Sequence, residues 1–254
     1  MCLIAFAFTP GQDRHLLLAA NRDESHERPA RPMAWWEWPQ GPLAGRDEKA
    51  GGTWLAVARD GRWAAVTNFR DPRAGNGTRS RGDLPVGFLT GQRSPADYVA
   101  SVYRHRHEYG AFNLLAGDRD HLWYCSTHAE SRAVEPGVHA LSNGLLDEPW
   151  PKSRRIATAL GGLASSAVSV DSERLLALMH DREPAPDADL PDTGVGIALE
   201  RFLSPPFIVG ERYGTRCTTV LCLGNRNQAF ERSHGRGGDP VSQLHYRFSR
   251  ASFD

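Results

Sequence analysis

The sequence has no excess of charge of either sign, because its 254 residues include 30 basic and 30 acidic side chains. A general nucleic-acid-binding protein would show a basic excess, so no nucleic-acid partner is expected. No apolar run approaches the ~20 residues that a membrane-spanning helix needs. The apolar run at the N-terminus, residues 2–8, has no basic segment before it, so we do not read it as a signal peptide.

Cysteine is scarce as well. The chain has four, at Cys2, Cys125, Cys217 and Cys222, and their spacing fits neither a set of metal ligands nor a disulfide framework. The ten histidines are scattered without a His-Glu-x-x-His cluster, so neither a metal nor a cofactor is expected. Reduced thiols are the simplest account of the cysteines, and they favour a cytoplasmic location.

The first third of the chain reads as β-structure. The apolar runs Leu3–Phe8 and His15–Ala20 flank a turn-rich segment and predict a hairpin. The segments Trp54–Ala58 and Trp63–Thr67 predict a second hairpin around the Asp60-Gly61 turn. Because these runs are continuous rather than alternating, the strands are expected to lie in sheets covered on both faces.

Helical and strand patterns alternate through the rest of the chain. Helices are expected at Leu84–Leu89, Pro95–His105, Trp150–Leu163 and Asp171–His180, strands at Phe112–Gly117, His121–Ser126, Val138–Ser142, Arg216–Leu223, Gln228–Arg232 and Gln243–Phe248, and an irregular loop at Arg182–Gly196. No internal repeat or linker-like segment interrupts this order, so residues 1–254 are expected to form one domain. The pattern favours an α+β fold with stacked sheets and helical outer layers.

Cys2 is the most informative residue of the chain. Because cysteine is small, methionine aminopeptidase is expected to remove Met1 and to expose the α-amine of Cys2. An α-amine titrates near pH ~8 and can act as the general base for the thiol of the same residue. On position alone, a small apolar residue in a buried strand is the better interpretation. The polar residues elsewhere in the chain favour the catalytic interpretation of Cys2 over the structural one.

The polar tetrad Asn21-Arg22-Asp23-Glu24 directly follows the second apolar run. Four polar residues at the end of an apolar strand are costly to bury unless they satisfy one another. A hairpin would bring the tetrad close to Cys2, where Arg22 would stabilise a thiolate and Asp23 would hold the new α-amine. An ordinary charged surface turn is the alternative.

Two asparagines and one arginine occupy further strand ends. Asn68 and Asn143 each end a predicted strand, where a fixed amide can stabilise a developing oxyanion by ~3 kcal/mol. Turn formation is the alternative use of asparagine at such positions. Asn143 is expected to reach into a cleft, whereas Asn113 lies inside an apolar strand and should be structural. Arg216 begins a late strand, where it would pair with Asp23 or with a substrate anion.

The chain resembles the NRDE family, the group of the transport-and-Golgi-organisation proteins, which is named after the tetrad Asn21-Arg22-Asp23-Glu24. Further matching motifs lie between residue 2 and about residue 220: Gly45-Arg46-Asp47, Gly51–Leu55, Thr67–Pro72, Ser80-Arg81-Gly82, Leu141–Asp147, Pro149–Lys152, Leu190–Gly194 and Tyr213–Arg216. This family is in turn similar to the cysteine branch of the N-terminal-nucleophile hydrolases, which includes choloylglycine hydrolases and penicillin V acylases.

The resemblance implies a four-layer αββα sandwich of two stacked, mostly antiparallel sheets. It also implies a catalytic set with Cys2 as nucleophile, supported by Arg22, Asp23, Asn68, Asn143 and Arg216. The motif residues Asn21, Glu24, Trp54 and Arg70 are expected to contact the substrate. In the hydrolases two residues separate the arginine from the aspartate, whereas Arg22 and Asp23 are adjacent. Adjacent residues on a strand point to opposite faces, so both serve one site only if the strand ends or bulges there.

Three functions remain open. The first is an amidohydrolase that cleaves a linear, non-peptide C–N amide through Cys2 after removal of Met1. The second is a non-catalytic binding or trafficking protein for haem, an acyl-lipid or an acyl-thioester, in which the aromatic segment Trp35–Pro39 lines the pocket. Ordinary strand packing explains that segment more simply. The third is an inactive structural relative. The partner is thus a small-molecule amide or an amphipathic ligand, and the oligomeric state is not predicted.

Overall fold

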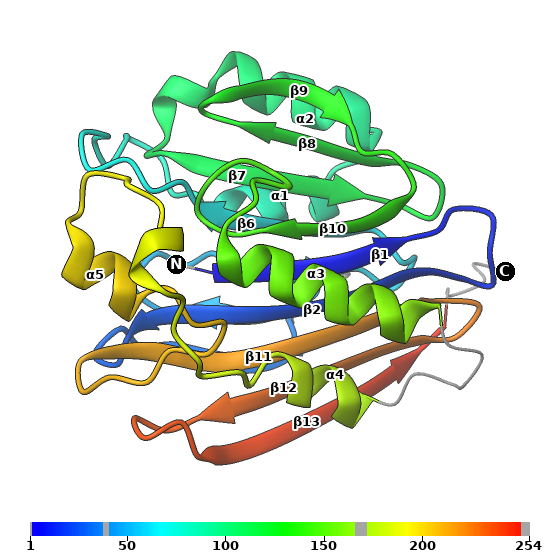
Figure 1. The fold of residues 1–254 in the computed structure, drawn as a ribbon. Helices are drawn as coiled ribbons and strands as arrows, with labels where there is room; N and C mark the ends of the chain where they lie inside the picture. Colours follow the sequence, from blue (N-terminus) through cyan, green and yellow to red (C-terminus); the bar gives the residue numbers. More distant parts are fainter. Residues whose placement is uncertain (1, 38–40, 166–171, 250–254) are drawn as a thin grey trace, which may run out of the picture.

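The computed structural model describes residues 2–37, 41–165 and 172–249. Within these residues, two sheets of six and seven strands stack face to face (Figure 1). The six-stranded sheet contains, in spatial order, β10 (Gly137–Leu141), β1 (Cys2–Phe8), β2 (Arg14–Ser25), β11 (Tyr213–Gly224), β12 (Asn227–His234) and β13 (Pro240–Phe248). The seven-stranded sheet runs from β3 (Ala30–Trp35) through β4 (Leu43–Asp47), β5 (Leu55–Val57), β6 (Trp63–Asn68), β7 (Phe112–Gly117) and β8 (Leu122–Ser126) to β9 (Ala129–Ala133).

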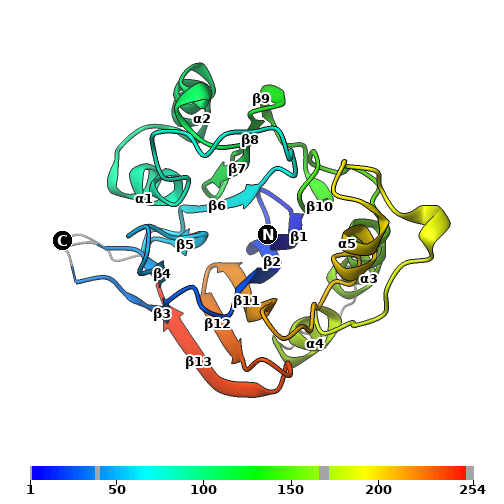
Figure 2. The ribbon, with the colours of Figure 1, turned by 90° about the vertical axis from the view of Figure 1, so that its left-hand side faces the viewer.

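Helices cover the outer face of each sheet (Figure 2). The seven-stranded sheet packs against α1 (Asp83–Thr90) and α2 (Pro95–Arg104), and the six-stranded sheet against α3 (Pro151–Ala164) and α4 (Ser172–Leu178). The remaining helical segments are α5 (Ile197–Phe202) and the 3₁₀ turns Arg106–Glu108 and Asp187–Asp189. The layers therefore follow the order αββα, and the antiparallel pairing of the strands confirms the predicted sandwich.

Strand β1 shows why its apolar run is continuous. Ile4, Phe6 and Phe8 point into the core between the sheets, whereas Leu3, Ala5 and Ala7 pack under the helical layer of α3 and α4. Side chains alternate between the two faces of a strand, so a strand buried on both faces must be apolar at every position. The same reasoning holds for residues 16–20 of β2.

Several elements differ from the sequence prediction. Strand β2 continues to Ser25, so the polar tetrad lies inside the strand and not after it. Strands β3, β4 and β9 and helix α5 were not predicted, and β9 is a mostly exposed edge strand with no apolar alternation. In the aromatic segment, Trp35 ends β3 and its ring lies 5.4 Å from that of Phe248, which is ordinary sheet packing. Residues 38–39 of that segment and the predicted helix start at residue 171 lie outside the described residues.

The described helices include none that is both long enough and apolar enough to span a bilayer.

The core between the two sheets should dominate stability. Leu18 is fully buried in it, so Leu18→Ala should lower the free energy of unfolding by about 2–5 kcal/mol. Val241→Ala is the control, because this β13 side chain is 68% exposed and its loss should cost about 0.5 kcal/mol or less. Urea denaturation measures both. Equal losses for the two variants would contradict the assignment of the core.

Candidate functional site

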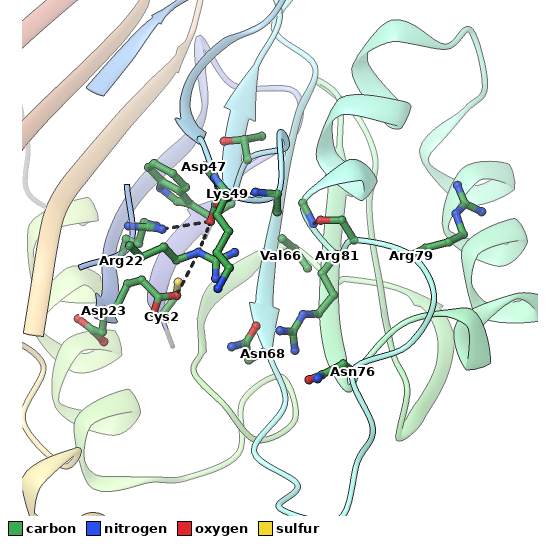
Figure 3. A pocket seen from close by; sticks show the side chains of 17 residues that line it. Cys2, Arg22, Asp23, Asp47, Lys49, Val66, Asn68, Asn76, Arg79 and Arg81 are labelled. Carbon is green, nitrogen blue, oxygen red and sulfur yellow. Dashed lines mark hydrogen bonds and ion pairs between the residues drawn. The ribbon is translucent and has the colours of Figure 1, made fainter. Parts of the chain in front are cut away.

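A cavity of about 470 Å³ opens at the end of the sandwich where β1 begins and β6 ends (Figure 3). We call it the Cys2 pocket. Its lining includes Cys2 from β1, residues 22–24 of β2, Trp54 before β5, Asn68 at the end of β6, and residues 76 and 79–82 from the loop before α1. The pocket thus lies between Cys2, the first residue of β1 in the six-stranded sheet, and strand ends and loops of the seven-stranded sheet. It also collects residues of the tetrad and several of the other sequence motifs.

The register of β1 against β2 sets the relation of Cys2 to the tetrad. Cys2 pairs with Arg22, and β2 continues three residues past this pair. Strand β11 is irregular at the same level, since Cys217 pairs with Arg22 and Thr215 with Asp23, which leaves Arg216 as an extra residue. Such a bulge bends and twists the sheet locally. The bulge lies in β11, the strand next to β2. Arg22 and Asp23 both line the pocket, although they are adjacent residues of β2.

Asp23 is buried beneath the pocket and held by β11. The Thr215 hydroxyl donates a 2.7 Å hydrogen bond to its Oδ1, and the Tyr213 hydroxyl donates to its main-chain carbonyl at 2.8 Å. Burial raises the pKa of the Asp23 carboxyl, whereas the positive charge of Lys152 and the Thr215 hydrogen bond act in the opposite direction. The carboxylate therefore sits in a fixed position where a positive charge is favourable.

The thiol of Cys2 is half-buried and free of any disulfide. Burial raises its pKa, and the charge of Asp23 adds to this effect. Arg22 and the main-chain N–H of Asp23 lower the pKa but do not reverse the shift. At neutral pH the sulfur is therefore protonated, and it needs a base before it can act as a nucleophile.

Arg22 is fixed on the pocket wall by an aromatic ring and a carboxylate. Its guanidinium lies 4.3 Å from the ring centroid of Trp54 and 3.4 Å from Oδ2 of Asp47. The same carboxylate oxygen accepts a 2.6 Å bond from Nε of Arg28. Asp47 therefore orients two arginines at once. The sequence motif Gly45-Arg46-Asp47 marked this aspartate, but its partners were not predicted.

Asn143 lies next to Asn68. The β1–β10 pairing ends with Ile4 opposite Leu141, and the next residue, Ser142, donates a 3.5 Å hydrogen bond to the Cys2 carbonyl. The Asn143 side chain donates a 2.8 Å bond to the Asn68 carbonyl, and its Oδ1 is buried without a hydrogen-bond partner in the described structure. Asn68 itself lines the Cys2 pocket, whereas Asn143 lines a neighbouring cavity of about 580 Å³. Asn143 thus forms part of the wall between the two cavities.

Asn113 has the fully bonded environment expected of a structural residue. Its amide donates to the Thr67 hydroxyl at 3.1 Å and to the Gly144 carbonyl at 2.9 Å. Its Oδ1 accepts a 2.8 Å bond from the Tyr124 hydroxyl. This side chain ties β6, β7 and β8 to the loop that carries Asn143, so it supports the site from behind.

Asn21 and Arg70, like Asn143, do not line the Cys2 pocket. Asn21 points toward the helical side, where its amide donates to the carbonyls of Met179 and Pro206. Arg70 lines the neighbouring cavity, where it pairs with Glu200 and stacks 4.9 Å from the centroid of Trp150. Both side chains serve packing or a different cavity.

Arg216 also differs from expectation. It donates to the carbonyls of Ser25 at 2.7 Å and Arg28 at 3.2 Å, and it lines a separate cavity of about 210 Å³ behind Trp54. Strand β11 provides a different partner for Asp23, namely Thr215, the residue before Arg216. Arg216 is therefore better described as holding the bulge and the turn after β2 than as a group of the Cys2 pocket.

The sequence analysis did not single out Lys152, a buried cation whose charge lowers the pKa of Asp23. Its amine donates a 2.9 Å bond to the Leu203 carbonyl. Burial lowers the pKa of Lys152 to about 8, while the charge of Asp23 acts to raise it. A signal was available, because a cation in the first turn of a helix opposes the helix dipole and needs another reason to be there. Among the described residues, no group of three or more His, Cys, Asp or Glu side chains is placed to hold a metal ion.

Lys152 should make stability depend on pH. Its pKa is about 8 in the folded chain and ~10.4 in an unfolded one, so the unfolded chain binds more protons between these values. The free energy of unfolding therefore rises with pH in this window. Lys152→Met removes this titration, so the free energy of unfolding of the wild type should rise by about 3 kcal/mol relative to that of Lys152→Met between pH ~7 and pH ~10.5. Urea unfolding of both chains across this range tests it, and a difference between them that is independent of pH would contradict it.

Solved structures share this fold at low sequence identity. A mutant of the conjugated bile acid hydrolase from Clostridium perfringens superposes with a TM-score of 0.53 at 10% identity, covering 99% of both chains. The N-acylethanolamine-hydrolyzing acid amidase orthologue of Caenorhabditis elegans gives a TM-score of 0.52 at 8% identity, covering 87% of this chain and 92% of that one. The chain therefore shares its αββα architecture with these two hydrolases, in agreement with the fold that the sequence resemblance implied.

Sequence comparison shows the family directly. The chain is 32% identical over 268 residues to the transport and Golgi organization protein 2 homolog of Bos taurus, covering 95% of each chain. Its identity to the corresponding Homo sapiens protein is 32% over 244 residues, covering 88% of each. The family model "Transport and Golgi organisation 2" matches residues 1–233. This chain is therefore a member of the transport and Golgi organisation 2 family.

Proposed function

We propose that this chain is an N-terminal-nucleophile amidohydrolase that cleaves a linear, non-peptide C–N amide through Cys2. The observation that carries the proposal is the half-buried thiol at the start of β1, which lines a polar cavity between Asp23 on one side and Asn68 on the other. The two solved structures are named for hydrolysis of conjugated bile acids and of N-acylethanolamines. In the first of them, the mutation replaces a cysteine at the second position by alanine.

The reaction begins with removal of Met1, which frees the α-amine of Cys2. The amine takes the thiol proton, the sulfur attacks the substrate carbonyl carbon, and the C=O electron pair moves to the oxygen. As the tetrahedral intermediate collapses, the C–N bond breaks and the ammonium returns its proton to the leaving amine. A water molecule, deprotonated by the same amine, then hydrolyses the thioester, which releases the acid and restores the thiol. Every proton is thus carried by Cys2 itself.

The surrounding residues have distinct tasks in this scheme. Asp23, fixed by Thr215, stabilises the ammonium form of the α-amine. Arg22, held by Asp47 and Trp54, favours the thiolate. The amide of Asn68 faces the cavity and, together with the second N–H of Asn143, supplies donors for the oxyanion. Arg216 keeps the bulge of β11 in place, so its role is positioning.

A second function, binding or trafficking of haem, an acyl-lipid or an acyl-thioester without turnover, has two points in its favour. Burial raises the pKa of the Cys2 thiol, which makes an unreactive cysteine the default unless the α-amine is free. The names of the curated relatives also concern transport and Golgi organisation. The state of the N-terminus therefore separates the two functions.

The first test is covalent capture. With Met1 removed, as intact mass should show, Cys2 is expected to react with a β-lactone probe, and Cys2→Ala should abolish labelling while changing stability by only ~1 kcal/mol. Cys222→Ala is the control, because it removes another half-buried thiol and should leave labelling unchanged. Peptide mass spectrometry locates the adduct. Labelling at Cys125, Cys217 or Cys222, or labelling that survives in Cys2→Ala, would count against Cys2 as nucleophile.

The second test compares two buried asparagines. Asn143→Ala should slow acylation of Cys2 by the β-lactone about 100-fold, because an oxyanion donor is lost, with a modest effect on melting temperature. Asn113→Ala should do the opposite, since it removes the acceptor of the Tyr124 hydroxyl and the donor to the Thr67 hydroxyl and the Gly144 carbonyl, and should cost about 1–3 kcal/mol of stability. Full reactivity of Asn143→Ala would remove the oxyanion assignment and favour the carrier function.

A further inference from the structure

The charges around the Cys2 pocket do not balance. Five cationic and three carboxylate side chains line it. The cations are Arg22, Arg28, Lys49, Arg79 and Arg81, and the carboxylates are Asp23, Glu24 and Asp47. The chain as a whole has no net formal charge, so the excess of positive charge is a local property of the pocket. Its effect on a ligand depends on which of these charges already have partners.

The two partly buried carboxylates of the pocket, Asp47 and Glu24, are matched by two of its arginines. Asp47 contacts Arg28 at 2.6 Å and Arg22 at 3.4 Å through one oxygen, while its other oxygen accepts two main-chain N–H groups. Glu24 lies 3.9 Å from Nε of Arg28 and accepts the main-chain N–H of Ser25 at 2.8 Å. Arg22 and Arg28 are thus largely neutralised by these two residues.

The remaining cations differ in their environment. Arg79 pairs at 3.1 Å with Glu108, which does not line the pocket, so its charge is compensated from outside. Arg81 donates to the uncharged carbonyl of Ala111 at 3.0 Å. In the part of the chain that the structure describes, neither Arg81 nor Lys49 forms an ion pair. Burial and the positive charge of Arg28 lower the pKa of the Arg81 guanidinium, and the charge of Glu24 acts against them without reversing the shift.

A partly buried cation without a counter-charge is costly, and a ligand anion would relieve that cost. Figure 3 shows Arg81 with Asn68 and Asn76 on the side of the cavity formed by β6 and the following loop, across from Cys2 and Asp23. Guanidinium groups present a planar fork of N–H donors that suits oxyanions, and the two amides add uncharged donors beside it. The cavity volume, about 470 Å³, leaves room for a small molecule between the two walls.

We propose that the Cys2 pocket takes substrates that carry an anionic group, a carboxylate, sulfonate or phosphate, which Arg81 binds with the support of Lys49 while the reacting carbonyl lies at Cys2. The inference rests on the proposed function in that it takes Cys2 as the reacting atom. Recognition of the anion itself needs no turnover. An uncharged acyl amide would leave Arg81 without a partner and should be a poor substrate.

Alkylation of Cys2 by iodoacetate and by iodoacetamide tests the proposal without a known substrate. Both reagents form the same C–S bond and release iodide, so a change in thiol pKa alters both rates equally and cancels in their ratio. Relative to the ratio for N-acetylcysteine amide, a free thiol without a carboxylate of its own, the ratio for Cys2 should favour iodoacetate by about tenfold, the effect of one hydrogen bond to a charged group. Peptide mass spectrometry resolves Cys2 from the other cysteines, and added salt should lower the preference.

Substitutions assign the effect to residues. Arg81→Gln should reduce the ratio to that of the free thiol, and Lys49→Gln, an exposed position where misfolding is not expected, should lower it about twofold to threefold. Arg73→Gln is the matched control, because Arg73 lies on the same loop but is 93% exposed and lines the neighbouring cavity. Protection of Cys2 from iodoacetamide by acetate, methanesulfonate or inorganic phosphate, with acetamide as the neutral control, identifies the preferred anion.

The outcomes separate the two proposals. A wild-type ratio equal to that of the free thiol would overturn anion recognition, even in an active amidohydrolase. An undiminished ratio in both Arg81→Gln and Lys49→Gln would overturn the assignment to these residues. A raised ratio that depends on Arg81, in a protein that fails to react with the β-lactone, would sink the hydrolase function and leave the anion pocket in place.

Discussion

The register of β1 against β2 is the constraint on which the site depends. Cys2 stands opposite Arg22, and a slip of one residue would turn every side chain of β1 to the other face of the sheet. The two faces of β1 are both apolar, but their side chains differ in size: large ones such as Phe6 face the other sheet, and alanines face the helices. A slip would exchange large and small side chains between the two faces, and the packing prevents it. The packing of the core thereby fixes the position of a thiol at the edge of a cavity.

Strand β11 makes it possible to keep polar residues inside β2. Thr215 and Thr218 donate to Asp23 and Asn21, so the buried polar atoms of the tetrad meet hydroxyls from the neighbouring strand. The bulge at Arg216 lies between these two levels and adjusts the twist where β1 begins. Lys152 adds a positive charge on the helical side of Asp23. Stability and the electrostatics of the pocket are therefore set by the same few contacts.

Membership of the transport and Golgi organisation 2 family and the αββα architecture describe different levels of the molecule. The solved hydrolases share the layers at about one-tenth sequence identity, and a fold shared at that distance leaves the chemistry to individual side chains. Here those side chains include an arginine and an aspartate that are adjacent, a buried lysine whose charge acts on that aspartate, and Arg81 across the cavity from the thiol. The side chains that distinguish this pocket are therefore mainly charged ones.

By itself, the sequence determined the layers and the location of the site. Continuous apolar runs such as Leu3–Phe8 favoured strands covered on both faces, and the tetrad next to them pointed to the candidate site because polar residues are costly to bury. Only the tertiary structure decided which polar groups meet, since Asn21 and Arg22 are neighbours in the chain but point to opposite faces. The partners of Asp47 and Arg81 come from distant segments, and sequence spacing carries no information about such contacts.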